Sequence, residues 1–265
     1  MPAETPPESL PGPIQGIVDN AGCRLGFAAH SLSSGSTLSH LCDDAFTQAS
    51  AIKIPIVWEL YRAAEAGELS LSEPIAVDPA DGAGGCGVLQ NFAEGGSQIA
   101  LGDLAVMMIV LSDNVATNLL INRVTPEGVN RLLDGLGAPQ TRLRRKMMDF
   151  PAREAGLENT STPSEAVGLM SELHKRAASG DSVADHVQKV LRLKKESPVT
   201  DALAKKAKVT NKPGALDGLR TDWSIIERGD QAFAMAIMAD GAADEVLKPL
   251  FEKLATAIHG ELMPE

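Results

Sequence analysis

Two residues with catalytic potential stand three positions apart in the apolar segment QASAIKIPIVWEL, residues 48–60. They are Ser50 and Lys53, and in a helix this spacing places both side chains on one face, one turn apart. An unpaired ammonium is costly to bury, so burial lowers its pKa. A lysine of lowered pKa beside a serine can activate the hydroxyl as a nucleophile. The segment is equally compatible with a capping serine and a lysine whose head reaches water.

Two later segments carry polar side chains that could serve the same chemistry. Ser112, Asp113 and Asn114 form an S-D-N turn between two apolar stretches, which is also typical of a helix cap with an Asx-turn. Lys212 stands in the segment NKPG, beside a proline that cannot donate to a β-ladder. This strand is therefore expected at a sheet edge or facing a cleft, where a lysine can also simply protect the edge.

The composition limits the classes of partner. The chain has 265 residues, 44% of them hydrophobic, which suits one large or two intertwined domains. Its formal net charge of −11 argues against nucleic acid and membrane surfaces as partners. Residues 189–212 are locally basic, which is typical of a solvated face but would also attract a small anionic substrate.

Cofactor sites and targeting segments have no support in the sequence. The three cysteines form no CxxC pair and the five histidines have no metal-binding spacing, so we expect no disulfide framework, metal or cofactor. No apolar run reaches transmembrane length, and the start of the chain has no signal-peptide pattern. We therefore expect a cytoplasmic protein, or an exported one whose leader is absent from this chain.

The order of the predicted elements indicates the fold class. Strands are predicted at both ends of the chain, and helices dominate between them. This order predicts an α/β (α+β) fold, with an antiparallel sheet built from both chain ends, flanking helices and an inserted helical subdomain. The predicted divisions are a disordered lead-in at 1–14, a sheet subdomain at 15–49 plus 207–262 and a helical subdomain at 50–206, in one functional domain.

The three motifs S-x-x-K, S-D-N and K-x-G, in this order, resemble the set found in class A β-lactamases and penicillin-binding proteins. The segment LSDNVATNLLI, the GVLQ ahead of it and the STP before a helix are also similar to that family. The resemblance covers roughly residues 15–262. It implies a β-lactamase/D,D-peptidase-like fold with an active site between the sheet and the helical subdomain.

The resemblance also implies catalytic roles. Ser50 would attack a carbonyl and form an acyl-enzyme, Lys53 would take its proton, and Ser112 would relay that proton to the leaving group. The backbone N–H groups of Ser50 and Ala215 would form the oxyanion hole.

Three further residues would bind the substrate, according to the same resemblance. Asn114 would hold the amide of the substrate's side chain. Lys212 would attract a carboxylate of the substrate, and Gly214 completes the K-x-G motif on the same strand.

The sequence departs from the family pattern in two places. Pro213 replaces the hydroxyl residue of K-[ST]-G, and we expect Arg220 to compensate by binding the substrate's carboxylate. When Arg145 is aligned with the family's loop arginine, Met147 replaces the glutamate that activates the deacylating water. Asn159 likewise replaces the aspartate that closes the loop. The carboxylates nearby, none of them in register, are Asp149, Glu154 and Glu158.

One glycine pattern suggests a different class of site. Gly82, Gly84 and Gly87 fit the G-x-G-x-x-G pattern of dinucleotide-binding proteins. Such a site needs a buried strand before it and a βαβ unit around it, but Pro79 interrupts the preceding segment. We therefore favour a loop near the cleft.

The leading hypothesis is a serine hydrolase of the class A β-lactamase type, acting on a small substrate through acyl-Ser50. The substrate would be a β-lactam or a related amide that bears a carboxylate, and deacylation would be slow. One alternative is an esterase or D,D-peptidase on the same scaffold. Another is a penicillin-binding sensor module that is acylated without turnover.

Overall fold

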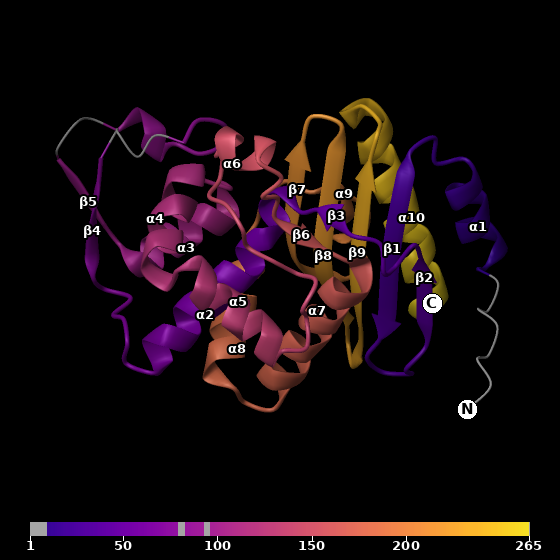
Figure 1. The fold of residues 1–265 in the computed structure, drawn as a ribbon. Coiled ribbons are helices and arrows are strands. Elements are labelled where there is room, and N and C mark those ends of the chain that lie inside the picture. The colour runs from indigo at the N-terminus through magenta and orange to yellow at the C-terminus, as the bar shows by residue number, and fades with distance from the viewer. Residues whose placement is uncertain (1–9, 79–82, 93–95, 265) are drawn as a thin grey trace, which may run out of the picture.

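The structure of the protein is a computed structural model that describes residues 10–78, 83–92 and 96–264 (Figure 1). A central antiparallel sheet divides the molecule into two layers of helices, as Figure 1 shows. The predicted fold class is confirmed, because both ends of the chain contribute strands to this sheet and helices fill the sequence between them.

The sheet has five strands in the order β2-β1-β9-β8-β7. Every neighbouring pair is antiparallel, and β7 lies at the edge, as Pro213 predicts. The β7–β8 hairpin turns at Gly218, whose φ of 71° favours glycine. The strand bounds are β1 Arg24–Ser31, β2 Thr37–His40, β7 Lys208–Leu216, β8 Leu219–Arg228 and β9 Gln231–Asp240.

Alternate residues of the sheet contribute to two separate cores. On β8, Trp223 and Ile225 face the large helical layer, whereas Ile226 faces the layer formed by the two ends of the chain. This alternation follows from the two-residue period of a strand. Because both faces of the central strands are covered, these strands are apolar almost throughout.

Helices cover both faces of the sheet. The layer near the chain ends contains α1 Gly12–Asp19, α9 Pro198–Leu203 and α10 Asp244–Leu262. The other layer contains α2 Lys53–Glu65, α3 Leu101–Val110, α4 Asn114–Val124, α5 Pro126–Gly135, α7 Pro163–Ala178 and α8 Ser182–Leu191, and α6 Phe150–Glu154 lies in a long loop beside it. In the part of the chain that the structure describes, no helix combines the length and the apolar character that a membrane span requires.

The start of the chain packs earlier than predicted. Residues 1–9 of the predicted lead-in lie outside the described residues, but α1 already begins at Gly12. Prolines at positions 11 and 13 flank its first residue, and Ile14 is fully buried in the core shared with α10. The lead-in predicted at 1–14 is therefore too long, because Ile14 contributes to the apolar core.

Two short sheets lie outside the central one. β3 Phe46–Thr47 pairs with β6 Thr160–Ser161, and β4 Pro74–Val77 pairs with β5 Ser97–Ala100. Neither β4 nor β5 was identified from the sequence. Each has four residues, too few for a clear periodic pattern.

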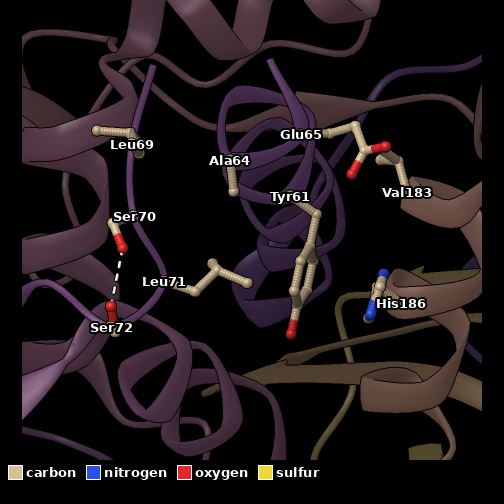
Figure 2. Close-up of a pocket in the computed structure, with 9 residues that line it drawn as sticks. All are labelled: Tyr61, Ala64, Glu65, Leu69, Ser70, Leu71, Ser72, Val183 and His186. Carbon is tan, nitrogen blue, oxygen red and sulfur yellow. Dashed lines mark hydrogen bonds between the residues drawn. The ribbon is translucent and has the colours of Figure 1, made fainter. Parts of the chain in front are cut away.

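A surface pocket of about 410 Å³ lies at the end of α2 that is remote from Ser50 (Figure 2). Tyr61 of α2 stacks on His186 of α8, with ring centroids 5.6 Å apart. The hydroxyls of Ser70 and Ser72 on the opposite side bond to each other at 2.9 Å. The pocket therefore joins α2, α8 and the 69–72 segment, and none of the predicted catalytic residues lines it.

Candidate active site

Ser50 lies in a tight turn and Lys53 begins the helix that follows. The turn is the 3₁₀ helix η1 Ala49–Ile52, and the regular helix α2 starts at Lys53. Neither start has a side-chain cap, and Lys53 is 0% exposed. Both local alternatives therefore fail, because Ser50 does not cap a helix and Lys53 does not reach water.

The hydroxyl of Ser112 connects three residues of the predicted site. It donates to Ser50 Oγ at 2.8 Å and accepts from Lys53 Nζ at 3.1 Å and Lys212 Nζ at 3.2 Å. Lys53 Nζ also donates to the Ser112 carbonyl at 2.8 Å and to Asn114 Oδ1 at 3.0 Å. The three motifs therefore meet around one oxygen atom, although 100 positions separate Ser112 from Lys212 in the sequence.

The S-D-N turn is rigidly attached to its surroundings. Ser112 has a positive φ of 52°, which is unusual for a residue with a side chain. Asp113 caps α4 by accepting from Ala116 N at 3.0 Å, and it also accepts from Val88 N at 2.7 Å. These bonds fix the backbone that presents Ser112 to Ser50.

The glycine-rich segment packs on this turn instead of forming a nucleotide site. Gly82 lies outside the described residues, but Gly84 O accepts from Asn114 Nδ2 at 3.1 Å and Cys86 O accepts from Asn114 N at 3.1 Å. A Cβ at Gly87 would come within 2.3 Å of the Asp113 carboxyl group, so glycine is needed there. The flanking strands β4 and β5 are antiparallel, so the segment does not belong to a βαβ unit.

Strand β7 passes directly beside Ser50. Lys212 is 2% exposed, and its Nζ also donates to the Pro213 carbonyl at 2.9 Å. A Cβ at Gly214 would lie 2.7 Å from Ser50 N, so only glycine allows this approach. Ala215 follows and lines the same pocket as Ser50.

Gln48 holds the Ser50 turn against the sheet, a role that the sequence analysis missed. Its carbonyl accepts from Thr221 Oγ1 at 3.0 Å, and its Oε1 accepts from Trp223 Nε1 at 2.8 Å. Its Nε2 donates to Phe46 O at 2.9 Å, so the side chain is fully used inside the core. Only the neighbouring S-x-x-K motif could have pointed to it.

The two lysines share a dry environment. Burial lowers the pKa of Lys53 well below its ordinary value, and the charge of Lys212 lowers it further. Burial likewise lowers the pKa of Lys212 to about 7, and a neighbouring lysine, Lys195, adds to the effect. Both effects favour the neutral amine at Lys53, which is the state that a general base requires.

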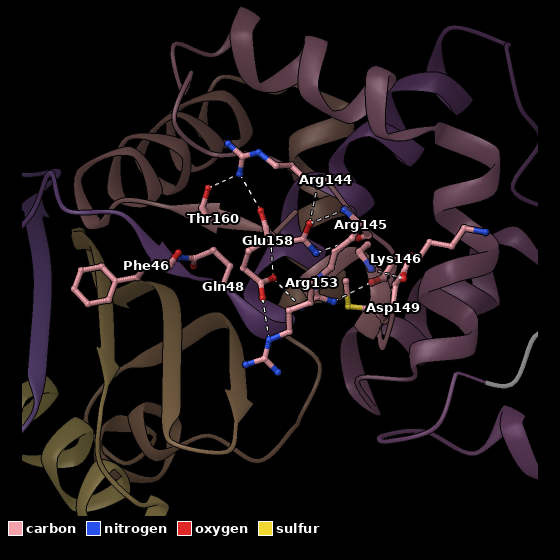
Figure 3. A network of polar contacts seen from close by, with 12 residues as sticks. Phe46, Gln48, Arg144, Arg145, Lys146, Asp149, Arg153, Glu158 and Thr160 are labelled. Carbon is pink, nitrogen blue, oxygen red and sulfur yellow. Dashed lines mark hydrogen bonds and ion pairs between the residues drawn. The ribbon is translucent and has the colours of Figure 1, made fainter. Parts of the chain in front are cut away.

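A loop from Arg144 to Asn159 forms another wall of the pocket. Figure 3 shows the network of polar contacts in this loop. The amide of Asn159 closes this loop, because Oδ1 accepts from Arg144 N at 2.8 Å and Nδ2 donates to Arg145 O at 3.1 Å. Arg145 also pairs with Glu158 at 2.7 Å. The Asn159 side-chain amide therefore joins the two ends of the loop through hydrogen bonds. The ion pair with Arg145 is made by Glu158.

Met147 is placed in the pocket by bonds to its backbone. Asn118 on α4 accepts from Met147 N at 2.8 Å and donates to Met147 O at 3.1 Å. The Met147 side chain is 8% exposed and lines the same pocket as Ser50. The pocket has a volume of about 180 Å³, and Met148, Leu216 and Cys86 are further lining residues.

The carboxylates of the loop are engaged in other contacts. Asp149 caps α6 by accepting from Ala152 N at 3.1 Å, and Glu154 is exposed outside the pocket lining. Glu158 lines the pocket, but Arg145 pairs with its carboxylate and the Asn159 N–H also donates to it. The Glu158 carboxylate is therefore already engaged by donors of the protein.

Arg220 is not among the residues that line this pocket. It pairs with Ala215 in the β7–β8 register, so its side chain starts from the sheet face opposite to that of Lys212, which pairs with Trp223. Its guanidinium bonds to Asp244 at the start of α10. The structure therefore brings together Ser50, Lys53, Ser112, Asn114, Lys212, Gly214 and Ala215, but it places Arg220 with Asp244.

Comparisons with known proteins identify the family to which the chain belongs. The sequence profile of the β-lactamase enzyme family matches residues 12–262. A β-lactamase of Rhodobacter capsulatus is 31% identical over 206 residues, which cover 76% of this chain and 68% of the relative. A β-lactamase of Streptomyces albus G is 29% identical, and the alignment covers 67% of this chain and 57% of the relative.

Solved structures show the same fold over nearly the whole length. A β-lactamase from Sphaerobacter thermophilus has a TM-score of 0.88 and 27% identity, covering 95% of this chain and 97% of its own. PBP-A has a TM-score of 0.82 at 24% identity, covering 96% of this chain and 98% of its own, which supports the fold alone. The chain therefore belongs to the β-lactamase enzyme family and is a serine hydrolase of the class A type.

Proposed function

We propose that Ser50 forms an acyl-enzyme with a β-lactam or a related amide that bears a carboxylate, and that release of the acyl group is slow. The observation that carries the proposal is the Ser112 hydroxyl, which contacts Ser50, Lys53 and Lys212 together. This arrangement joins a nucleophile, a base and a cation in one site.

The contacts of Lys53 suit a neutral amine. Such an amine has two N–H donors and one lone pair, and the carbonyl of Ser112 and Oδ1 of Asn114 can take the two donors. The lone pair is then left for the Ser112 hydroxyl at 3.1 Å. When the Ser112 hydroxyl turns toward Lys53, Ser50 can donate to Ser112 in its place.

Acylation then moves one proton in a balanced cycle. As Ser50 Oγ bonds to the carbonyl carbon, its proton passes to Ser112 Oγ and the proton of Ser112 passes to Lys53 Nζ. Collapse of the tetrahedral intermediate breaks the C–N bond, and the proton returns through Ser112 to the leaving nitrogen. The backbone N–H groups of Ser50 and Ala215 would stabilise the oxyanion, and Gly214 lets β7 approach closely enough.

Substrate binding is assigned to Asn114 and Lys212. Asn114 lines the pocket and would hold the amide of the substrate's side chain. Lys212 uses two contacts inside the protein, so its ammonium has one further donor for a carboxylate. Arg220 remains a second candidate for that carboxylate, acting from its position beside Asp244.

Slow release of the acyl group is expected because the loop from Arg144 to Asn159 presents no free carboxylate to the pocket as a base. Deacylation needs a base for water, and Met147 offers none where the family resemblance places a glutamate. Glu158, a carboxylate that lines the pocket, is paired with Arg145. This missing base also favours the alternative of an esterase or D,D-peptidase, in which Lys53 would serve both steps, and of a sensor that stays acylated.

Intact-mass spectrometry after addition of a penicillin tests the proposal. We expect rapid appearance of one adduct and its slow loss, with a burst of product in the kinetics. Absence of any adduct together with absence of turnover would contradict the proposal. Relative rates with a β-lactam, a simple ester and a D-Ala-D-Ala peptide then distinguish a lactamase from an esterase or peptidase, and an adduct that never decays indicates a sensor.

A further inference from the structure

The pocket beside Ser50 is largely apolar where it is not formed by the catalytic groups. Its apolar lining residues are Ala49, Met147, Met148, Ala215 and Leu216. The charged side chains among the described lining residues, Arg145 and Glu158, pair with each other at 2.7 Å. The pocket therefore offers a substrate mainly apolar surface on this side, where the charges are already balanced.

Met148 lies beside Asn114, the residue proposed to hold the amide of the substrate's side chain. A Cβ on Gly85 would stand 2.9 Å from Asn114 Nδ2 and 3.3 Å from Met148 Sδ. The terminal methyl carbon of Met148 is 3.5 Å from the same position. The thioether and the amide are therefore neighbours, and a group that extends from the substrate's amide would lie close to the thioether.

The backbone of Met148 is fixed, whereas its side chain is adaptable. Met148 has a positive φ of 60°, which is uncommon for a residue with a side chain, and such residues cluster at functional sites. Asn118 holds the preceding residue, and Phe150 N donates to the Met148 carbonyl at 3.0 Å. Methionine has three rotatable bonds and a polarisable sulfur, so the side chain can adapt to apolar groups of different shapes.

The pocket is too small to enclose a whole substrate. Its volume of about 180 Å³ is below the roughly 300–1,000 Å³ of pockets that bury a drug-sized ligand. Exposed apolar residues that gather at one place mark a binding surface, whereas scattered ones do not. Four large apolar side chains, here called the apolar rim, are exposed and either line the pocket or stand within two residues of a lining residue: Val88, Phe150, Leu157 and Leu216.

We propose that this protein selects substrates whose acyl side chain is apolar and elongated, and that Met148 and the apolar rim bind that side chain. The inference rests on the proposed function, in which Ser50 attacks the substrate's carbonyl while Asn114 holds the amide that carries the acyl side chain. Each methylene that moves from water onto this surface favours binding. A charged group there would lose water without gaining a partner.

The test uses penicillins that share one nucleus and differ only in the acyl side chain. The second-order rate constant of acylation is measured by intact-mass spectrometry for the acetyl, butanoyl, hexanoyl and octanoyl compounds. It is also measured for benzylpenicillin and for its derivative with a carboxylate on the benzylic carbon. We expect the rate constant to rise by about two- to fourfold for each added methylene, and to fall when the carboxylate is added.

Met148→Gln keeps the length of the side chain but replaces the thioether with an amide. It should lower the gain in rate between the acetyl and hexanoyl compounds by about three- to tenfold. Met148→Leu is the matched control, because it keeps an apolar side chain of similar volume, and it should keep the native gain. The gain is a ratio of two rates in one variant, so a general loss of activity cancels. An unchanged gain in Met148→Gln overturns the role of Met148.

The double variant Phe150→Ser, Leu157→Ser tests the apolar rim and should lower the further gain between the hexanoyl and octanoyl compounds by about twofold or more. Val246→Ser is its control, because Val246 is exposed on α10, in the layer on the other face of the sheet. An unchanged gain in the double variant overturns the role of the rim.

The native protein separates this inference from the proposed function. Rates that do not depend on chain length, or that rise when the carboxylate is added, overturn the inference and leave acylation of Ser50 intact. Absence of an adduct with every penicillin, the acetyl compound included, overturns the proposed function and this inference with it.

Discussion

The pocket beside Ser50 has two walls that are held by different kinds of contact. On the polar wall, side chains bind one another, with Ser112 in contact with Ser50, Lys53 and Lys212. On the loop wall, the bonds described above mostly join a side chain to a backbone group, and the ion pair of Arg145 with Glu158 is the exception among them. Asn118, for example, bonds to both the N–H and the carbonyl of Met147.

The difference decides which residues can change without loss of structure. A substitution on the polar wall removes a partner from several buried groups at once. On the loop wall, Asn118 bonds to the backbone of residue 147, so it would hold that backbone regardless of which side chain stands at position 147. Met147 can therefore stand where the family resemblance places a glutamate while the loop keeps its place, which supports the proposal of an intact acylation site without a base for release.

The strongest way to break the polar wall is Ser50→Ala. This change removes the nucleophile itself, so we expect acylation by a penicillin to fall on the order of 10⁶-fold, to no detectable adduct. Intact-mass spectrometry and peptide mapping after labelling measure it. Ser70→Ala is the matched control. The Ser70 hydroxyl lies in the surface pocket at the end of α2 that is remote from Ser50, and among the described residues it bonds only to Ser72. Labelling that survives in Ser50→Ala would assign the nucleophile to another residue.

Lys53→Met tests two roles of this lysine on the polar wall: its role as a base in acylation, and its effect on how stability depends on pH. Loss of a general base is expected to slow acylation by about 10²- to 10⁴-fold. Because the pKa of Lys53 is lowered in the folded protein, the unfolded chain binds more protons between that pKa and about 10.5, and native stability rises with pH over this window.

Methionine removes this proton linkage but leaves two buried acceptors, the Ser112 carbonyl and Asn114 Oδ1, without their lysine donor. We therefore expect the rise of native stability with pH that Lys53 contributes to disappear. Thermal unfolding from pH 6 to pH 9 measures this effect, with Lys146→Met, at an exposed lysine, as the control. A variant that acylates normally, or that keeps the native pH dependence of stability, would contradict this account of Lys53.

Met147→Glu tests whether the loop wall lacks only a carboxylate for deacylation. A carboxylate at this position could activate water, so we expect release of the acyl group to accelerate by at least about 10-fold, while acylation changes little. Decay of the mass adduct and the steady-state rate after the burst measure the effect. Met147→Gln has the same shape without the charge and should release slowly.

The native carboxylates of the loop could already supply the base for deacylation, which would contradict the proposal of slow release. If Asp149 or Glu154 already activates water, the native protein would turn over without a burst, and Asp149→Asn or Glu154→Gln would create one. The structure uses Asp149 as a helix cap and leaves Glu154 outside the pocket lining, so we expect neither variant to alter release. No effect from Met147→Glu would instead point to Lys53 as the base in both steps.

The sequence was most informative where chemistry depends on side-chain identity. Ser50, Lys53, Ser112 and Lys212 belong to ordered motifs, and the structure places them around one oxygen atom. The long helices and the β7–β9 strands were also predicted, because their apolar periodicity is sustained over ten or more residues or bounded by glycine turns.

Contacts between side chains and distant backbone atoms escaped prediction. Gln48 and Asn118 resemble ordinary polar residues, and only the fold brings them to Trp223 and Met147. Glu165 is a similar case, since its position predicts a capping box with Thr162. Thr162 does cap the Glu165 N–H at 3.2 Å, but the Glu165 carboxylate binds Thr141 N at 2.6 Å instead. Local patterns identify the candidate residue, and tertiary packing decides its partner.

Arg220 lies outside both walls, beside Asp244, and its replacement should give the smallest effect. Its guanidinium is tied to Asp244, so it can contribute to a carboxylate only as an oriented charge behind β7. We expect Arg220→Gln to raise KM for benzylpenicillin about fivefold, with a much smaller change for the neutral methyl ester, because one partly screened charge is worth about 1 kcal/mol. Asp244→Asn is the matched control, since it frees the guanidinium while keeping its charge, and it should preserve the preference for the anion. An equal loss on both substrates in Arg220→Gln would show that Arg220 only ties β8 to α10, and Lys212 would then be the sole cation assigned to the carboxylate.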